Sequence, residues 1–83
     1  MEKQIIRIGN VELYADEALR LYTEKQYIVT YSRIYQLHYS AAQKRVYGTE
    51  IYYQSKLCLR GRYHAMSAAA VNRLIGKELL NAE

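Results

Sequence analysis

The chain has no Pro, Phe or Trp, only four Gly, and a single Cys among its 83 residues. One thiol, Cys58, cannot form an internal disulfide, which excludes the disulfide framework of many small secreted domains. The low Gly content and the absence of Pro argue against a disordered, collagen-like or linker segment. With 51% hydrophobic residues, the composition predicts one small globular domain over residues 1–83.

Long apolar runs and processing signals are also missing. No run approaches the roughly 18 residues that a membrane-spanning helix needs. Arg7 interrupts the short apolar stretch near the start of the chain, so no signal-peptide pattern opens it. We therefore expect a cytoplasmic protein that does not associate with a membrane.

Catalytic and metal-binding motifs are absent from the sequence. Cys58, His38 and His64 are too few and too scattered for a zinc site, and no C-x-x-C or H-x-x-x-H spacing occurs. There is no Gly-rich phosphate loop, nucleophile elbow or pair of carboxylates suited to acid–base catalysis. We expect a non-enzymatic protein without metal or cofactor. A small metal-independent ribonuclease, which needs only a few Arg, Lys, His and Tyr side chains, stays open as an alternative.

Acidic residues are scarce in the middle of the chain. Residues 25–77 carry nine Lys or Arg against Glu50 alone, whereas residues 1–24 and 78–83 each carry a net charge of −2. Folding concentrates the repulsion among these cations, and a polyanionic partner relieves it. The charge pattern indicates nucleic acid as the first candidate partner and an acidic protein surface as the second. A basic surface kept only for solubility is the third interpretation.

All ten aromatic residues are Tyr. Aromatic residues that only fill a core are ordinarily Phe, because Phe has no hydroxyl that needs a hydrogen-bond partner on burial. The exclusive use of Tyr therefore indicates rings at the boundary of the core, where they can also stack on bases or pack in a protein interface. The alternative is that most of the rings belong to the core.

Strand patterns occur at residues 4–8, 26–31 and 49–53, with a looser pattern at 56–66 that Gly61 interrupts. Gly9 and Asn10 leave two continuations open. Either Asn10 caps a helix over 11–24, or Gly9 and Asn10 form a hairpin turn into a strand over 11–14. We expect a helix over 16–24 in both cases.

Residues 33–47 are ambiguous between a helix and a hairpin. Tyr31, Tyr35 and Tyr39 lie four residues apart, which a helix can use, but they also share one parity with Tyr27 and would form a stripe along a strand. Enrichment in Ile, Tyr and Thr favours the hairpin, with residues 41–44 as its loop.

The last predicted element is a helix over 68–81, capped by Ser67 and containing Gly76. Its apolar stripe consists of Val71, Leu74, Ile75 and Leu79. Together these elements predict an α+β fold, in which a small, mainly antiparallel sheet carries the C-terminal helix packed on one face. The opposite face would then be available for binding or for pairing in a homodimer.

The densest group of binding residues is the run from Arg60 to His64, in which two arginines flank a glycine. We expect RNA or another single-stranded nucleic acid as the partner, with RNA ahead of DNA. The alternative is an accessory protein, of the phage or mobile-element type, that binds and inhibits a nucleic-acid-processing complex. The expected binding surface consists of Arg33, Tyr35, Tyr39, Lys44, Arg45, Lys56, Arg60, Arg62, Tyr63 and His64.

Overall fold

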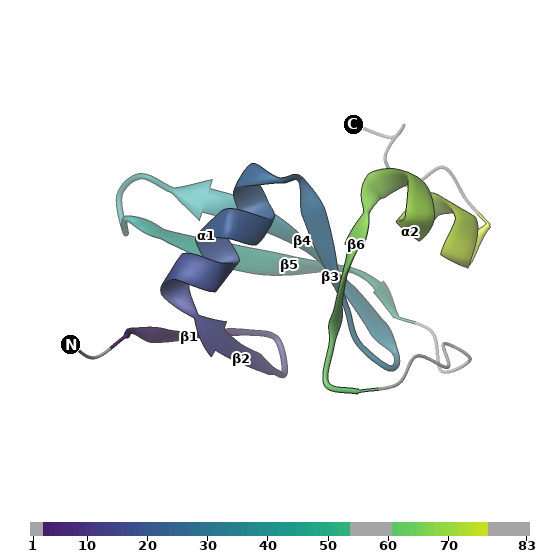
Figure 1. Ribbon diagram of the computed structural model, residues 1–83, viewed down its shortest axis with the longest axis horizontal. Helices are drawn as coiled ribbons and strands as arrows, with labels where there is room; N and C mark the ends of the chain where they lie inside the picture. Colours follow the sequence, from purple (N-terminus) through teal and green to yellow (C-terminus); the bar gives the residue numbers. More distant parts are fainter. Residues whose placement is uncertain (1–2, 54–60, 77–83) are drawn as a thin grey trace.

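The computed structural model describes residues 3–53 and 61–76 (Figure 1). It has an α+β fold, as predicted, but its strands form two antiparallel sheets rather than one: a hairpin β1-β2 and a four-stranded sheet in the order β5-β4-β3-β6. The elements follow the chain as β1 (Ile5–Ile8), β2 (Val11–Tyr14), α1 (Ala15–Thr23), β3 (Gln26–Val29), β4 (Arg33–Ser40), β5 (Arg45–Tyr53), β6 (His64–Ser67) and α2 (Ala68–Ile75).

The hairpin β1-β2 decides between the two continuations after residue 8. Ile8 pairs with Val11, so Gly9 and Asn10 form the two-residue turn, and Gly9 has the positive φ of 62° that such a turn favours. Helix α1 begins at Ala15, one residue before the predicted start, and Asp16 and Glu17 in its first turn complement the helix dipole.

The second hairpin, β4-β5, is confirmed with its loop at residues 41–44. β5 is a single strand of nine residues, and the strand predicted over 49–53 is its second half. The register shifts once, because Ile34 pairs with Tyr52 whereas Tyr35 pairs with Glu50. Strand β3 ends at Val29, before the predicted residue 31, because Thr30 closes a turn: its backbone N–H donates to the Arg33 carbonyl over 2.8 Å.

Helix α2 begins and ends at recognisable caps. The Ser67 hydroxyl accepts a hydrogen bond from the Ala70 N–H over 3.3 Å, which confirms the predicted N-cap. The prediction that Gly76 lies inside the helix is wrong: its φ of 65° is left-handed and ends α2 after Ile75. Residues 77–81, including Leu79, lie outside the described residues, as does the 56–60 part of the looser strand pattern.

Two hydrophobic cores lie on opposite sides of β3, because alternate side chains of a strand point to opposite faces. The first core lies between the sheet and the pair formed by α1 and β1-β2, and it consists of Ile6, Ile8, Val11, Leu13, Ala18, Leu21, Ile28, Tyr35, Leu37 and Val46. The second core lies beneath α2 and consists of Tyr27, Val29, Ile34 and Val71. Leu74 and Ile75 are only half-buried against it.

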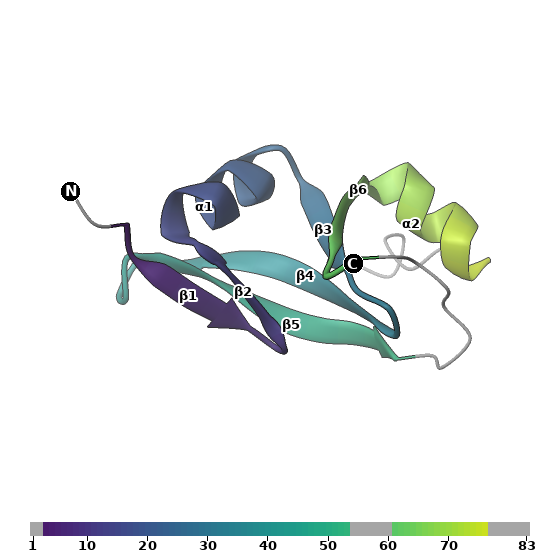
Figure 2. The same ribbon diagram turned by 60° about the horizontal axis from the view of Figure 1, so that its bottom comes forward.

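The two faces of the four-stranded sheet are therefore covered to different extents, by α1 with the hairpin β1-β2 on one face and by α2 on part of the other. Figures 1 and 2 show α2 beside β6, at the end of the molecule away from α1 and the hairpin β1-β2. The prediction that the C-terminal helix packs on one face is confirmed. The expectation that the opposite face is free is wrong, because α1 and the hairpin β1-β2 cover it. Among residues 3–53 and 61–76, no element covers the part of the α2 face that lies on β4 and β5 beyond the reach of this helix.

The hairpin β1-β2 packs on β4 and β5 at two glycines. A Cβ on Gly48 would lie 2.1 Å from the Ile8 side chain, and one on Gly9 would lie 2.3 Å from the Tyr35 ring. The Tyr35 hydroxyl donates to the Asn10 Oδ1 over 3.0 Å, and this bond holds the ring against the turn. The absence of a side chain at these two positions allows the sheets to approach closely.

We predict that Gly9→Ala destabilises the protein more than Gly76→Ala. Both glycines have a left-handed φ, which costs an alanine about 1–2 kcal/mol. An added Cβ on Gly76 meets no atom of the described residues within 4 Å, its own chain neighbours aside, whereas Gly9→Ala also displaces the buried Tyr35 ring, at a further cost of about 1–3 kcal/mol. Urea unfolding of the two variants measures the difference, and equal destabilisation would contradict the packing described.

Candidate nucleic-acid interface

The uncovered part of the sheet presents polar and aromatic side chains from two paired strands. Leu37 and Val46 point into the first core and are 7% and 4% exposed. Their strand neighbours point to the opposite face, and the register pairs Gln36 with Thr49, His38 with Tyr47, and Ser40 with Arg45. We call these six residues the open face.

At the centre of the open face two rings are stacked. The centroids of His38 and Tyr47 lie 5.2 Å apart, with 28° between the ring planes. Tyr47 is 40% exposed, so much of its ring faces solvent. His38 supports the ring from a neighbouring strand, and a ring that is already oriented loses less entropy when a ligand stacks on it.

A hollow of about 380 Å³ lies beside this stack, lined by Ser40, Gln43, Arg45 and Tyr47. The Arg45 Nε donates to the Gln43 Oε1 over 3.2 Å, and the Gln43 backbone N–H donates to the Ser40 hydroxyl over 3.2 Å. These bonds hold the guanidinium at the edge of the hollow while engaging one of its five N–H donors. A cation, an amide, a hydroxyl and an aromatic ring therefore meet at one end of the open face.

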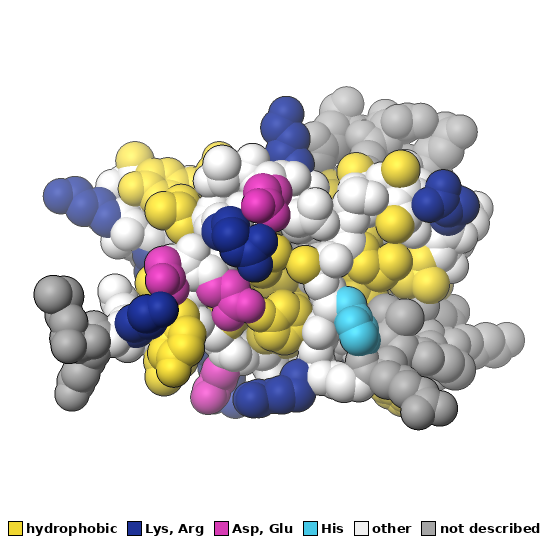
Figure 3. Space-filling view, in the orientation of Figure 1, with side chains coloured by type: hydrophobic (Ala, Val, Ile, Leu, Met, Phe, Trp, Pro, Cys, Tyr) yellow, Lys and Arg dark blue, Asp and Glu magenta, His cyan; other side chains and the backbone are white. Residues whose placement is uncertain are grey.

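In the folded chain the described carboxylates all have partners, whereas several Lys and Arg side chains form no ion pair. Four carboxylates of residues 3–53 and 61–76 lie within 4 Å of a cation, at Lys3–Asp16, Arg7–Glu12, Arg20–Glu24 and Arg33–Glu50. The fifth, Glu17, accepts a hydrogen bond from the Tyr63 hydroxyl. Acidic and basic side chains consequently mix on the side of the molecule seen in Figure 3. Five cations form no ion pair within the described part of the chain: Lys25, Lys44, Arg45, Arg62 and Arg73.

Three of the predicted interface residues have structural roles instead. Tyr35 is 2% exposed and belongs to the first core, so its assignment to a binding surface is wrong. Arg33 is half-buried, with its Nε 3.9 Å from the Glu50 carboxylate. Tyr63 packs against the first core and donates its hydroxyl to Glu17.

The other predicted residues are dispersed over the molecule. Tyr39 points to the face opposite Arg45, where its ring centroid lies 6.2 Å from that of Tyr22. Arg62 lines a separate hollow with Tyr63, and His64 lies exposed at the start of β6. Of the predicted residues that the structure describes, Arg45 alone belongs to the open face, and Lys44 lines a hollow with Leu19 and Tyr39. Lys56 and Arg60 lie outside the described residues.

The aromatic pair at the centre of the open face is not among the residues that the sequence predicted. The sequence pointed to His38 only as a possible metal ligand, and it did not set Tyr47 apart from the other tyrosines. The alternation of side chains along the predicted hairpin was the available signal, because Arg45 and Tyr47 share one parity. That alternation does not say which parity is buried, and the buried face is set by the hairpin β1-β2.

Within residues 3–53 and 61–76, no helix has the length and apolarity to cross a membrane, and no cluster of His, Cys, Asp or Glu could hold a metal ion. Comparison of the chain with family models, curated proteins and solved structures finds no match. Because no match assigns a function, the proposal below depends on the surface of the protein.

The expected homodimer is not tested by these observations and stays a prediction.

The contact between Tyr63 and Glu17 gives a prediction on alkaline stability. Burial, followed by the hydrogen bond to Glu17 and its negative charge, raises the pKa of Tyr63 from 10.0 to about 12. The native state therefore retains this proton at a pH where the unfolded chain has lost it, and the stability that the proton provides disappears as pH rises from about 10 to 12.

Alkaline titration followed by tyrosinate absorbance should show a late-ionising phenol that Tyr63→Phe removes. Glu17→Gln should shift that ionisation towards 10, because the variant has neither the carboxylate's hydrogen bond nor its charge. The stability of Tyr63→Phe should fall less steeply between pH 10 and 12 than that of the wild type. An unchanged titration in both variants would contradict the contact.

Proposed function

We propose that the protein is a non-enzymatic module that binds single-stranded nucleic acid, RNA ahead of DNA, on the open face. The observation that carries this proposal is the stack of His38 and Tyr47 beside Arg45, on a sheet face whose six residues include no carboxylate. Aromatic rings and cations on a sheet are a general means of holding single strands, because every base has a face that can stack.

The chemistry of the open face suits each part of a nucleotide. A base would stack on the exposed side of Tyr47, while Arg45 would meet the adjacent phosphate through its remaining N–H donors. Ser40 and Gln43 can donate and accept hydrogen bonds at the hollow. A ribose 2′-hydroxyl also donates and accepts, which supports RNA ahead of DNA.

A protein partner is the second candidate, supported by a different surface. Leu19, Tyr22 and Tyr39 are 47%, 40% and 45% exposed, and the Tyr22 and Tyr39 rings are adjacent. Exposed Tyr and Leu side chains of this kind suit the centre of a protein interface. Under this alternative, purified RNA binds weakly and a nucleic-acid-processing protein is the direct target.

The proposal predicts that RNA binding depends on the position of Arg45 on the open face and not only on the positive charge that Arg45 adds to the protein. Arg45→Gln should weaken the binding of a labelled unstructured RNA and reduce the magnitude of the log–log salt slope by about 0.7 for each phosphate that is no longer neutralised. Arg7→Gln is the matched control, since it removes the same charge from exposed β1, where Arg7 pairs with Glu12. A fluorescence-anisotropy titration at several salt concentrations measures both, and the RNA should remain intact throughout.

Equal losses of affinity in the Arg45 and Arg7 variants would show that only net charge matters, and would contradict an interface on the open face. Absence of RNA binding to the wild type at low salt would leave the protein partner as the better account.

Tyr47→Ala should cost about 1–3 kcal/mol of RNA affinity, with little change in the salt slope, because a stacking contact releases no counterions. Tyr14→Ala is the control: Tyr14 is 47% exposed and has the Lys3 ammonium 5.3 Å from its ring centroid, but it lies on β2, away from the open face. A larger effect of Tyr14→Ala than of Tyr47→Ala would place the nucleic acid elsewhere.

A further inference from the structure

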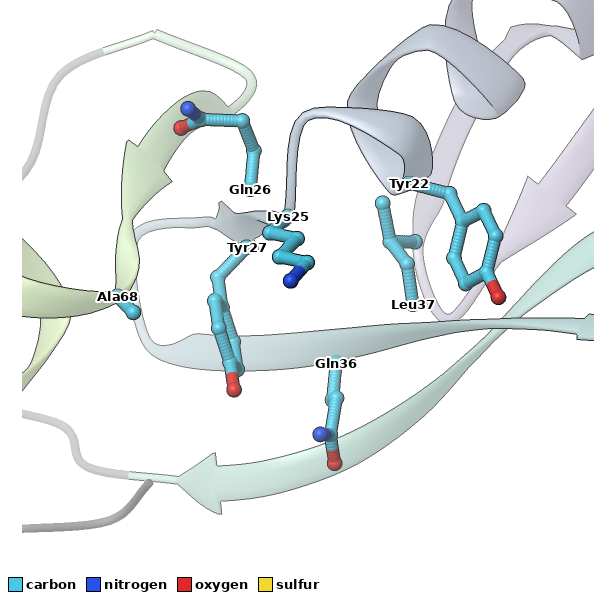
Figure 4. Close-up of a pocket in the computed structure, with 7 residues that line it drawn as sticks. All are labelled: Tyr22, Lys25, Gln26, Tyr27, Gln36, Leu37 and Ala68. Carbon is cyan, nitrogen blue, oxygen red and sulfur yellow. The ribbon is translucent and has the colours of Figure 1, made fainter. Parts of the chain in front are cut away.

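A pocket of about 350 Å³ lies where β3 and β4 separate (Figure 4). The two strands pair at Ile28–Tyr35 and Val29–Ile34, and beyond these pairs they diverge towards the end of α1. The resulting space is lined by Tyr22, Lys25, Gln26, Tyr27, Gln36, Leu37 and Ala68. Its volume falls within the range of small-molecule sites.

Lys25 supplies a positive charge to this pocket from a constrained position. Its side chain points into the pocket, between Tyr27 on one side and Leu37 and Tyr22 on the other (Figure 4). Its backbone has a φ of 57°, and its N–H donates to the Tyr22 carbonyl over 3.0 Å at the end of α1. Lys25 forms no ion pair within the described part of the chain, since the neighbouring Glu24 pairs with Arg20 at 3.0 Å.

The rest of the lining is aromatic, amide and aliphatic, and no acidic residue lines the pocket in the part of the chain that the structure describes. Tyr22 offers an exposed ring, whereas Tyr27 belongs to the second core and lines the pocket with a buried one. Gln26 and Gln36 place amide groups at the margin of the pocket, directed away from Lys25 (Figure 4). An ammonium suits a phosphate, aromatic rings suit a planar base, and amides suit the polar edge of that base.

The pocket adjoins the open face through strand β4. Gln36 lines the pocket and also belongs to the open face, four residues before Ser40 at the hollow. At about 3.3 Å per residue, these two positions lie roughly 13 Å apart along the strand. A single strand that crosses the His38–Tyr47 stack could therefore reach the pocket.

We propose that this pocket binds one nucleoside phosphate, with its phosphate on Lys25. The nucleoside phosphate is either the terminal nucleotide of a strand on the open face or a free mononucleotide. This inference rests on the proposed function, because the open face is what brings a strand to the pocket. It adds a second anion-binding position that the sequence did not predict.

The test uses adenosine 5′-monophosphate as the probe and Lys25→Asn as the variant, because asparagine tolerates the left-handed backbone. Lys44→Asn is the matched control, since Lys44 also has a positive φ, 54°, and the same charge is removed outside the pocket. Calorimetric titration should show about tenfold weaker binding to Lys25→Asn and little change for Lys44→Asn. Thermal unfolding should confirm that both variants are folded.

Adenosine without its phosphate, and inorganic phosphate alone, should each bind more weakly than the monophosphate. A hexanucleotide with a terminal phosphate identifies the source: if that phosphate strengthens binding and Lys25→Asn abolishes the gain, the pocket holds a strand end. If it adds nothing while the monophosphate still binds through Lys25, the ligand is a free nucleotide.

Equal losses of affinity in the two lysine variants, or adenosine binding as tightly as its monophosphate, would overturn the inference. So would a lack of monophosphate binding to the wild type. If RNA binding then still depended on Arg45 and Tyr47, the pocket inference would have failed while the proposed function stood.

Discussion

The close packing of the hairpin β1-β2 on β4 and β5 is the constraint on which the rest of the structure depends. Ile8 packs onto Gly48, and Gly9 lies against the Tyr35 ring, whose hydroxyl donates to Asn10. This packing buries one face of the long hairpin β4-β5 and builds the first core with α1. Because α2 covers only the end of the sheet near β3 and β6, the other face of β4-β5 is left open by the elements that the structure describes.

The same arrangement sorts the charges of the chain. Each carboxylate of residues 3–53 and 61–76 has a partner, and Glu12, Asp16, Glu17 and Glu24 all lie on the hairpin and α1 side. The cations left without an ion pair in those ranges include Arg45 on the open face and Lys25 at the pocket. A basic stretch that looks continuous in the sequence is thus divided by folding into structural cations, such as Arg33, and cations available to an anionic partner.

The sequence predicted most of the secondary structure but little of the interface. The hairpin β4-β5, the helix after β2 and the Ser67 cap follow from local residue patterns and capping chemistry, whereas the hairpin β1-β2 is one of two continuations that the sequence leaves open. Local patterns do not tell that Tyr35 is buried and Tyr47 exposed, because each lies on a strand of the same hairpin. Which side is buried depends on Gly9 and Gly48, which are distant in sequence. The contact of Tyr63 with Glu17 spans 46 residues, and no local pattern foretells it.

Mapping of amide chemical shifts during titration with an unstructured RNA would test the central claim most directly, and a 9.8 kDa chain suits this measurement. We predict that the largest changes fall on His38, Ser40, Arg45 and Tyr47 and extend along β4 to Gln36. Amides of the hairpin β1-β2, including Arg7 and Glu12, should move little. Changes centred on that hairpin or on Leu19 and Tyr22 of α1, with the open face unaffected, would contradict the account.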